Sequence, residues 1–330
     1  MSKINLYFCG GAGALISRFL PEKIPEFCAK PTIHYLDTSD SEKNFHRPDS
    51  KFTMFYEPEV KSGSGGVRSG KIDLIRTHLP AFIVDNPHAD INIVVVSTSG
   101  ASGAVISHFL VEDMVKNGKK VIVLISQSPT TYVRAGNSLK SLMGYRHLAT
   151  KHSNSVVGWV YEAMGAFESA DRYLVQDLTV LLHLLNGKIQ GVDDSDLETL
   201  LSPERLPDMG YNADFYSISL LFENRYNLET SPISILTLSP PGSVDDIKSG
   251  ATQTYSGIID EEAYSKMYSS DNGEPVLSLA VFDCHVPSWL TSLSRAVDAL
   301  KQRIDVKRSV KTEISKNVDL SNTTGEGLII

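Results

Sequence analysis

Two short runs of small residues have the composition of loops that hold phosphate groups. The first run is Gly10, Gly11, Ala12 and Gly13, and the second is Ser99, Gly100, Ala101, Ser102 and Gly103. Each follows an apolar run typical of a buried strand and precedes a helical pattern, so that backbone N–H groups and the positive end of a helix meet at one sheet edge. Glycine lets an anion approach the backbone without a Cβ in the way. We expect the two loops to grip a polyphosphate jointly.

Carboxylates follow two other predicted elements. Asp37 comes directly after the strand-like run 32–36, where polar groups at the carboxyl edge of a sheet usually face a ligand. Asp193 and Asp196 lie in an acidic segment that follows a long apolar helical pattern. Considered locally, that segment is a helix start with Asp193 or Ser195 as the cap.

Two more familiar phosphate motifs compete with this interpretation. Residues 65–71 almost spell a Walker A loop, but Ile72 stands where serine or threonine must bind magnesium, so we set that motif aside. Gly65 and Gly66 nevertheless remain candidate nucleotide-binding residues. The first glycine loop with Asp37 also resembles a dinucleotide-binding fingerprint, although Ile16 occupies the position of its third glycine. That alternative predicts a nicotinamide or flavin oxidoreductase and leaves the second loop and the acidic segment without a role.

The elements that must position these residues alternate between strand and helix. Apolar, β-branched runs predict strands at 4–9, 32–36, 52–56, 91–96 and 120–125, with helices after the first and fourth strands and over 71–82. This alternation implies an α/β fold with a doubly wound parallel sheet. The leucine-rich stretch 166–186 has apolar residues on more than one face, which predicts a core helix between two bodies.

The second half of the chain predicts a smaller α/β domain. Strand-like runs cover 233–238 and 275–282, and a long final helix covers about 287–306. We therefore divide the chain into a nucleotide-binding domain (1–165), a central core helix (166–188), a C-terminal domain (189–310) and a flexible tail (311–330).

The bulk composition excludes several function classes. A net charge of -8 over 330 residues offers no strong positive field, which argues against direct nucleic-acid binding. The three cysteines include no CxxC pair, so neither a disulfide framework nor a zinc site is predicted. The apolar run at the N-terminus is too short for a signal peptide or a membrane span. We expect a cytoplasmic protein that uses no membrane.

Taken together, the motifs resemble the tubulin and FtsZ family. In that family a glycine-rich loop follows the first strand, a GGGTGSG-like loop follows the fourth, and a core helix leads into a loop with two acidic residues. Here the fourth-strand loop has become the run from Ser99 to Ala104, and Asp193 and Asp196 stand in an Asp-x-x-Asp-Leu-x-Thr pattern. Phe167 and Asp171 match the helix start that contacts guanine. The chain length and the long final helix are most similar to phage-encoded members.

The resemblance implies a GTPase that polymerises into filaments. GTP or GDP with Mg²⁺ would occupy the first and fourth loops, while Asp193 and Asp196 of the next subunit would orient the attacking water. Self-association along and between filaments is implied, with the tail as a strap that docks through residues 328–330, and so is a role in positioning phage DNA or a phage compartment in the host cytoplasm. A dinucleotide-binding oxidoreductase and a tubulin-like filament with little GTPase activity remain the alternatives.

Overall fold

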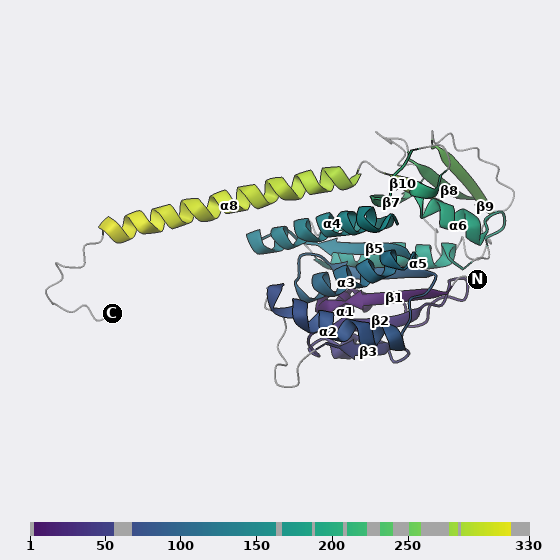
Figure 1. Ribbon diagram of the computed structural model, residues 1–330, viewed down its shortest axis with the longest axis horizontal. Coiled ribbons are helices and arrows are strands. Elements are labelled where there is room, and N and C mark those ends of the chain that lie inside the picture. Colours follow the sequence, from purple (N-terminus) through teal and green to yellow (C-terminus); the bar gives the residue numbers. More distant parts are fainter. Residues whose placement is uncertain are drawn as a thin grey trace.

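Ten strands form one sheet with helices on both faces (Figure 1). The computed structural model describes residues 3–55, 68–162, 167–186, 189–206, 210–222, 232–239, 251–258, 277–282 and 285–317. Of the helices within these ranges, none is long and apolar enough to cross a membrane.

The first half of the chain builds a parallel sheet of six strands. They are β1 (Ile4–Cys9), β2 (Thr32–Asp37), β3 (Lys51–Met54), β4 (Ile91–Ser97), β5 (Lys120–Gln127) and β6 (Val156–Glu162). Their spatial order is β3-β2-β1-β4-β5-β6, with every neighbouring pair parallel. Residues Ile91 to Val96 of β4 are all buried, as expected for a strand that is covered on both faces. The predicted α/β fold with a doubly wound parallel sheet is confirmed.

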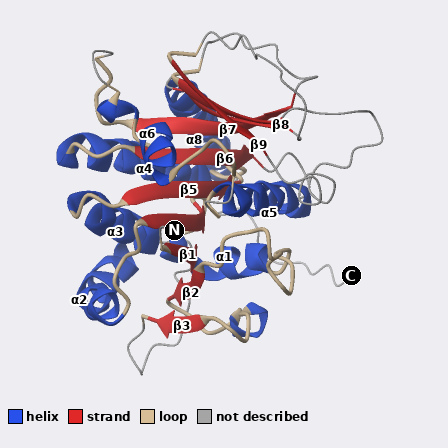
Figure 2. Ribbon diagram, turned by 90° about the vertical axis from the view of Figure 1, so that its right-hand side faces the viewer, coloured by secondary structure: helices blue, strands red, loops and turns tan. Residues whose placement is uncertain are grey.

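Helices cover the two faces in separate layers (Figure 2). The helices α1 (Gly10–Ser17) and α5 (Phe167–Leu184) pack on one face. On the other face lie α2 (Ser69–Asp85), α3 (Ser102–Lys116), α4 (Tyr132–His152) and the first part of α8 (His285–Asn317). The short 3-10 helix η1 (Lys43–Phe45) contacts α1. The helices cover the faces of the sheet but not the loops at the two ends of its parallel strands, where ligands can bind.

The second half of the chain extends the same sheet. The strands β7 (Phe215–Phe222), β8 (Ser234–Ser239), β9 (Gln253–Ile258) and β10 (Leu277–Phe282) continue the order as β6-β7-β10-β8-β9. β7 is parallel to β6, whereas β10 runs antiparallel to β7 and β8. The helices α6 (Asp194–Leu200) and η2 (Pro203–Arg205) connect α5 to these strands.

The helix α5 is the buried centre of the molecule. Leu174, Leu178 and Leu181 are at most 1% exposed, and they share one apolar cluster with residues of β1, β5 and the second-half strands. Near the C-terminal end of α5, the Leu182 carbonyl accepts a hydrogen bond from the Ala29 N–H (2.8 Å), shortly before β2. A helix with apolar side chains on several faces is buried on several faces.

Several elements differ from the sequence-based expectation, and the strands β7 and β9 were also not predicted. The stretch 126–165 had no assigned element, yet it holds the 21-residue helix α4 and the strand β6. The final helix begins at His285 and continues to Asn317, so it includes residues 311–317 of the predicted tail. Residues 318–330 lie outside the described part of the chain.

Truncation of a buried α5 leucine should destabilise the protein strongly. Leu178→Ala is expected to lower the free energy of unfolding by about 2–5 kcal/mol, because it removes apolar contacts and leaves a cavity. The matched control is Tyr173→Ala on the same helix, where the side chain is 62% exposed and a change within about 0.5 kcal/mol is expected. Urea denaturation followed by circular dichroism compares the two. Equal losses would mean that α5 is not packed as described.

Candidate functional site

A cavity of about 320 Å³ opens at the carboxyl edge of the parallel sheet. It lies where β1, β4 and β5 end, between the starts of α1 and α3 and near the start of α5. Its lining residues are Ala12, Leu15, Ile16, Arg18, Ser97, Ser99, Gly100, Ser126, Ser128, Arg134 and Asp171. Three of the sequence-predicted regions, the two small-residue loops and the start of α5, therefore contribute to one space.

The two small-residue loops touch through their backbones. Gly10 has a φ of +75°, and a Cβ placed on it would come within 2.8 Å of the Gly103 Cα and N atoms. A Cβ on Gly103 would come within 2.4 Å of the Cys9 carbonyl oxygen. Neither position can hold a larger residue without a shift of the chain. Gly10 and Gly103 lie behind the cavity, as do Gly13, Ala101 and Ser102, all of which are buried.

The two helices that begin at this edge lack side-chain caps. The residues preceding α1 and α3 are Cys9 and Ala101, and neither forms a side-chain hydrogen bond to its helix. By contrast, α4 is capped by Thr131 and α6 by Asp193. Uncapped first-turn N–H groups are a ready binding site for an anion, which the helix dipole also favours.

Serine side chains hold the second loop in place. The Ser99 hydroxyl accepts a hydrogen bond from the Ser128 N–H (2.7 Å) and shares another with the Ser138 hydroxyl (3.0 Å). The Thr98 hydroxyl also donates to Ser138 (3.2 Å). The Ser102 hydroxyl bonds to that of Thr38, which follows β2 (2.7 Å). The loop is therefore fixed by buried hydrogen bonds to three neighbouring segments.

Asp37 is a buried carboxylate behind the first loop. Its Oδ1 atom accepts a hydrogen bond from the Thr38 N–H (2.7 Å), and its Oδ2 atom lies 3.5 Å from where a Gly11 Cβ would be. Burial raises the pKa of the Asp37 carboxyl to about 6, and the Thr38 bond opposes this rise only in part. Asp37 does not line the cavity itself, so its place is next to the loop backbone.

The cavity also contains polar residues that the sequence did not suggest. Arg18 at the end of α1 and Arg134 in the first turn of α4 supply two guanidinium groups. The predicted residue Asp171 also lines the cavity, where its Oδ1 atom accepts a hydrogen bond from the Ser126 hydroxyl (3.0 Å). Two cations and a carboxylate around one space suit a ligand that has both anionic groups and N–H donors. The arginines carry no motif, since only folding brings α1 and α4 together.

The acidic pair lies far from this cavity. Asp193 caps α6 through its Oδ1 atom, which accepts hydrogen bonds from the N–H groups of Ser195 (2.8 Å) and Asp196 (2.9 Å). The Asp196 side chain accepts in return from the Asp193 N–H (3.1 Å), which completes a capping box. From Asp171 to its last residue, Leu184, the helix α5 spans roughly 20 Å, and the segment that leads to Asp193 follows. One subunit cannot bring both groups together, and Figure 1 shows α6 at the other end of α5.

For three predicted site residues the structure gives no side-chain contacts. Gly65 and Gly66 lie outside the described residues. Phe167 is the first residue of α5, and only its backbone is described.

Comparisons with known proteins give a consistent result. No protein-family model matches the chain. A phage tubulin-like protein of Pseudomonas phage phiKZ is 28% identical over 211 residues, which is 60% of this chain and 62% of that relative. The matched region thus spans less than two thirds of the relative's length.

Solved structures match over the whole chain. A protofilament of TubZ from bacteriophage PhiKZ superposes with a TM-score of 0.79 at 21% identity, covering 100% of this chain and 96% of that one. A structure of the phage tubulin PhuZ with GDP also gives 0.79, at 17% identity and with the same coverage. The chain therefore has the fold of the tubulin and FtsZ superfamily, as its motifs predicted.

Substitution of Gly103 should force the two loops apart. Gly103→Ala is expected to lower the free energy of unfolding by roughly 1–3 kcal/mol, because the added Cβ would clash with the Cys9 carbonyl. The matched control is Gly136→Ala in α4, where a Cβ meets nothing within 4 Å and a helical alanine should stabilise by about 0.5–1 kcal/mol. Denaturant midpoints measure both, and a neutral Gly103→Ala would contradict the close contact.

The buried Asp37 carboxyl should make stability depend on pH. Its folded-state pKa of about 6 lies above the ordinary value of 3.8, so it stabilises the fold only while protonated, and that contribution is lost as the pH rises through 6. Asp37→Asn keeps the acceptor for Thr38 and removes the charge. Its stability advantage over the wild type should grow by roughly 1 kcal/mol between pH 5 and pH 8. A pH-independent difference in unfolding free energy would show that Asp37 titrates normally.

Proposed function

We propose that this chain, which has the tubulin fold and is similar to phage tubulin-like proteins, is a GTPase that polymerises into filaments. GTP would bind in the carboxyl-edge cavity of one subunit, and Asp193 and Asp196 of the next subunit would complete the hydrolytic site. The phage relative and the protofilament neighbour support a cytoskeletal role in a host cytoplasm, in which the filaments would position phage DNA or a phage compartment.

The observation that carries this proposal is the separation of the two halves of the site. The loops with uncapped helix starts lie at one end of α5, and the paired carboxylates lie at its other end. Copies that stack head to tail would bring the acidic end of one subunit onto the nucleotide cavity of its neighbour. Hydrolysis would then require assembly, because the Asp193 and Asp196 carboxylates of a single subunit lie away from its own cavity.

Each part of the cavity has a task in nucleotide binding. The N–H groups at the starts of α1 and α3 would hold the phosphates, with Arg18 and Arg134 as additional cations. Asp171 would accept hydrogen bonds from the N–H donors of guanine, which adenine does not offer in the same pattern. Ser126 orients this carboxylate through its hydrogen bond. A preference for GTP would then follow from two contacts, one with the phosphates and one with the guanine base.

Magnesium fits this site as an ion that is held mainly by phosphate oxygens and water. Among the described residues no group of three or more His, Cys, Asp and Glu side chains could hold a metal ion. When bound with GTP, Mg²⁺ would neutralise negative charge on the phosphates. The protein's own contribution is the backbone cradle and the two guanidinium groups.

The catalytic step needs a water molecule in line with the γ-phosphate. The Asp193 and Asp196 carboxylates would accept hydrogen bonds from that water and take up its proton as its oxygen attacks phosphorus, with GDP as the leaving group. The capping box fixes both side chains relative to the first turn of α6. Their orientation is therefore set before the neighbouring subunit arrives.

The sequence also allowed a dinucleotide-binding oxidoreductase. The order of the first six strands suits that alternative equally well. It gives no role to the acidic capping box or to the close contact between the first and second loops, and so it is less well supported. A tail contact between subunits belongs to the proposal through the family resemblance, although residues 318–330 lie outside the described chain.

Neutral substitutions of the acidic pair test the proposal. Asp193→Asn and Asp196→Asn each keep an oxygen for the capping box and remove a carboxylate. We expect GTP binding to remain within about twofold and the maximal rate of phosphate release to fall by about 10²–10⁴-fold. The control is Glu198→Gln, which removes an exposed charge from the same helix and should leave the rate unchanged. Phosphate release and light scattering are recorded together across protein concentrations.

A mixing experiment then distinguishes catalysis between subunits from catalysis within one. The Asp193→Asn/Asp196→Asn protein is combined with Asp171→Ala, which has intact acidic residues but a weakened guanine site. Each alone should hydrolyse GTP slowly, and the mixture should recover activity at the interfaces that combine both intact halves. Filaments that form with GTP but release no phosphate, even for the wild type, would instead identify an assembly protein without efficient hydrolysis. If the wild type hydrolyses GTP but the mixture of the two variants recovers no activity, the shared site is refuted.

A further inference from the structure

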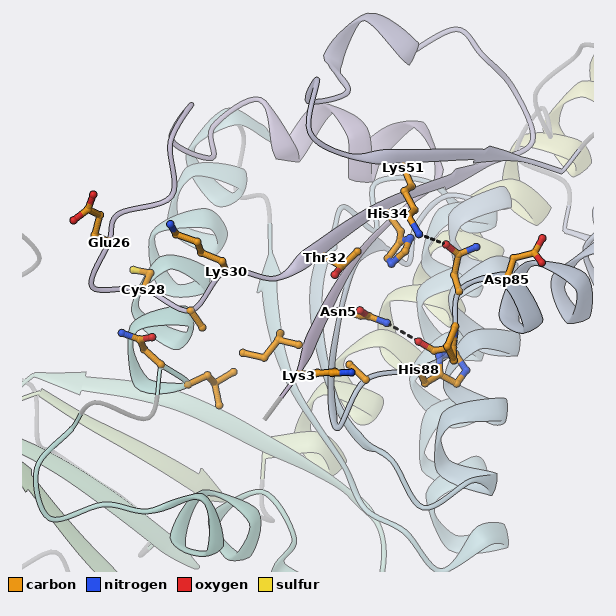
Figure 3. A pocket seen from close by; sticks show the side chains of 17 residues that line it. Lys3, Asn5, Glu26, Cys28, Lys30, Thr32, His34, Lys51, Asp85 and His88 are labelled. Carbon is orange, nitrogen blue, oxygen red and sulfur yellow. Dashed lines mark hydrogen bonds between the residues drawn. The ribbon is translucent and has the colours of Figure 1, made fainter. Parts of the chain in front are cut away.

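A larger cavity, of about 710 Å³, lies at the opposite edge of the sheet. It is bounded by the starts of β1, β2 and β3, by the connection from α2 to β4 and by the residues that follow α5 (Figure 3). It shares no lining residue with the nucleotide cavity. We call it the amino-edge cavity, and nothing in the proposed GTPase reaction uses it.

Part of the floor of the amino-edge cavity is a chain of buried polar groups. The Asn5 side-chain amide donates to the Tyr7 hydroxyl (2.8 Å), which leaves the Tyr7 hydrogen to bond His88 Nδ1 (3.2 Å). His88 Nε2 then donates to the Asp113 carboxylate (3.0 Å). Both ring nitrogens of His88 therefore have hydrogen-bond partners within the protein, and these groups form a rigid part of the cavity wall.

His34 differs from this chain because one of its nitrogens has no partner. The ring stacks on Tyr7 with its centroid 5.0 Å away and meets the edge of Phe82, so its orientation is fixed. It is only 2% exposed, and among the described residues its Nδ1 atom has no hydrogen-bond partner. Buried polar atoms are nearly always paired, because leaving one unpaired is unfavourable. His34 also lines the cavity, so its ring is fixed beside the space that a ligand would occupy.

Basic side chains outnumber acidic ones around this space. Lys3, Lys30 and Lys51 line it, against Glu26 and Asp85. Figure 3 shows the two carboxylates at opposite ends of the cavity, whereas the Lys51 amine lies beside His34. Lys51 donates to the Asn86 side-chain oxygen (3.0 Å) and keeps further N–H donors. Within the described chain the Lys30 amine has no ion-pair partner. On a protein of net charge -8, such a cluster favours an anion.

The remaining wall is apolar and includes Ile4, Ala29 and Leu185. A cavity of this size with a few placed polar groups is typical of a small-molecule site. We propose that the amino-edge cavity binds a small organic anion, whose phosphate or carboxylate group contacts Lys51, Lys30 and His34 and whose apolar body lies against Ile4 and Leu185.

The test uses simple probes and the signals of the histidines. Protein labelled with ¹³C at histidine Cε1 is titrated with phenyl phosphate and with benzoate, and the His34 signal is assigned with the His34→Phe variant, which keeps a ring stacked on Tyr7. We expect saturable shifts of the His34 and His88 signals with at least one of the two anions, which also identifies the preferred head group. The exposed His147 on α4 should not respond.

Two comparisons decide the outcome. Lys51→Gln should weaken binding by about tenfold, because a charge-assisted hydrogen bond is lost, while Lys140→Gln, which removes an exposed lysine of α4, should leave it unchanged. Phenol, which has the same ring without the charge, should bind more weakly than phenyl phosphate. No saturable shift with either anion, equal binding by Lys51→Gln and Lys140→Gln, or equal affinity for phenol would each overturn the proposal.

Discussion

The fixed length of the buried helix α5 is the constraint on which the rest of the molecule depends. A parallel sheet opens at two edges, and a helix of 18 residues that packs along it must begin at one edge and end at the other. Asp171 therefore lines the carboxyl-edge cavity, whereas Leu185, just after the end of α5, lines the amino-edge cavity. Leu178 and its neighbours are buried against both halves of the sheet, so the two edges cannot slide relative to one another without opening the core.

Much of this fold could be predicted from periodicity, but only where apolar residues decide the pattern. β4 and β5 are continuous apolar runs because both of their faces are covered, and α5 is apolar on several faces for the same reason. No helix was predicted over α4, because one side of it faces solvent and its buried face includes Asn137, Ser138 and Ser141. Asparagine and serine are residue types typical of loops. Those side chains are buried because they bond to the second loop and to Arg68, a contact that no local pattern announces.

The candidate site divides in a similar way. The glycine loops and the acidic pair could be found because backbone conformation and capping restrict the residue type at each position. Arg18, Arg134 and Ser126 could not, since arginine and serine are common on any surface and only the packing of α1, α4 and β5 brings these three to one cavity. The separation between the loops and the acidic pair was likewise invisible in sequence order, because it depends on the direction in which α5 crosses the sheet.

The second loop shows how a sequence can depart from a family pattern and keep its geometry. Ser99 stands where the tubulin and FtsZ pattern has glycine, and its hydroxyl group bonds to Ser128 and Ser138. The Ser102 hydroxyl bonds to Thr38. A glycine loop is ordered largely by the ligand that it binds, since glycine loses more conformational freedom than any other residue. Buried serine hydrogen bonds order the loop in advance, and they do so without placing a side chain between Gly10 and Gly103. Ser99 can carry a side chain because that side chain points away from the contact, whereas Gly10 and Gly103 meet at a place where no Cβ fits.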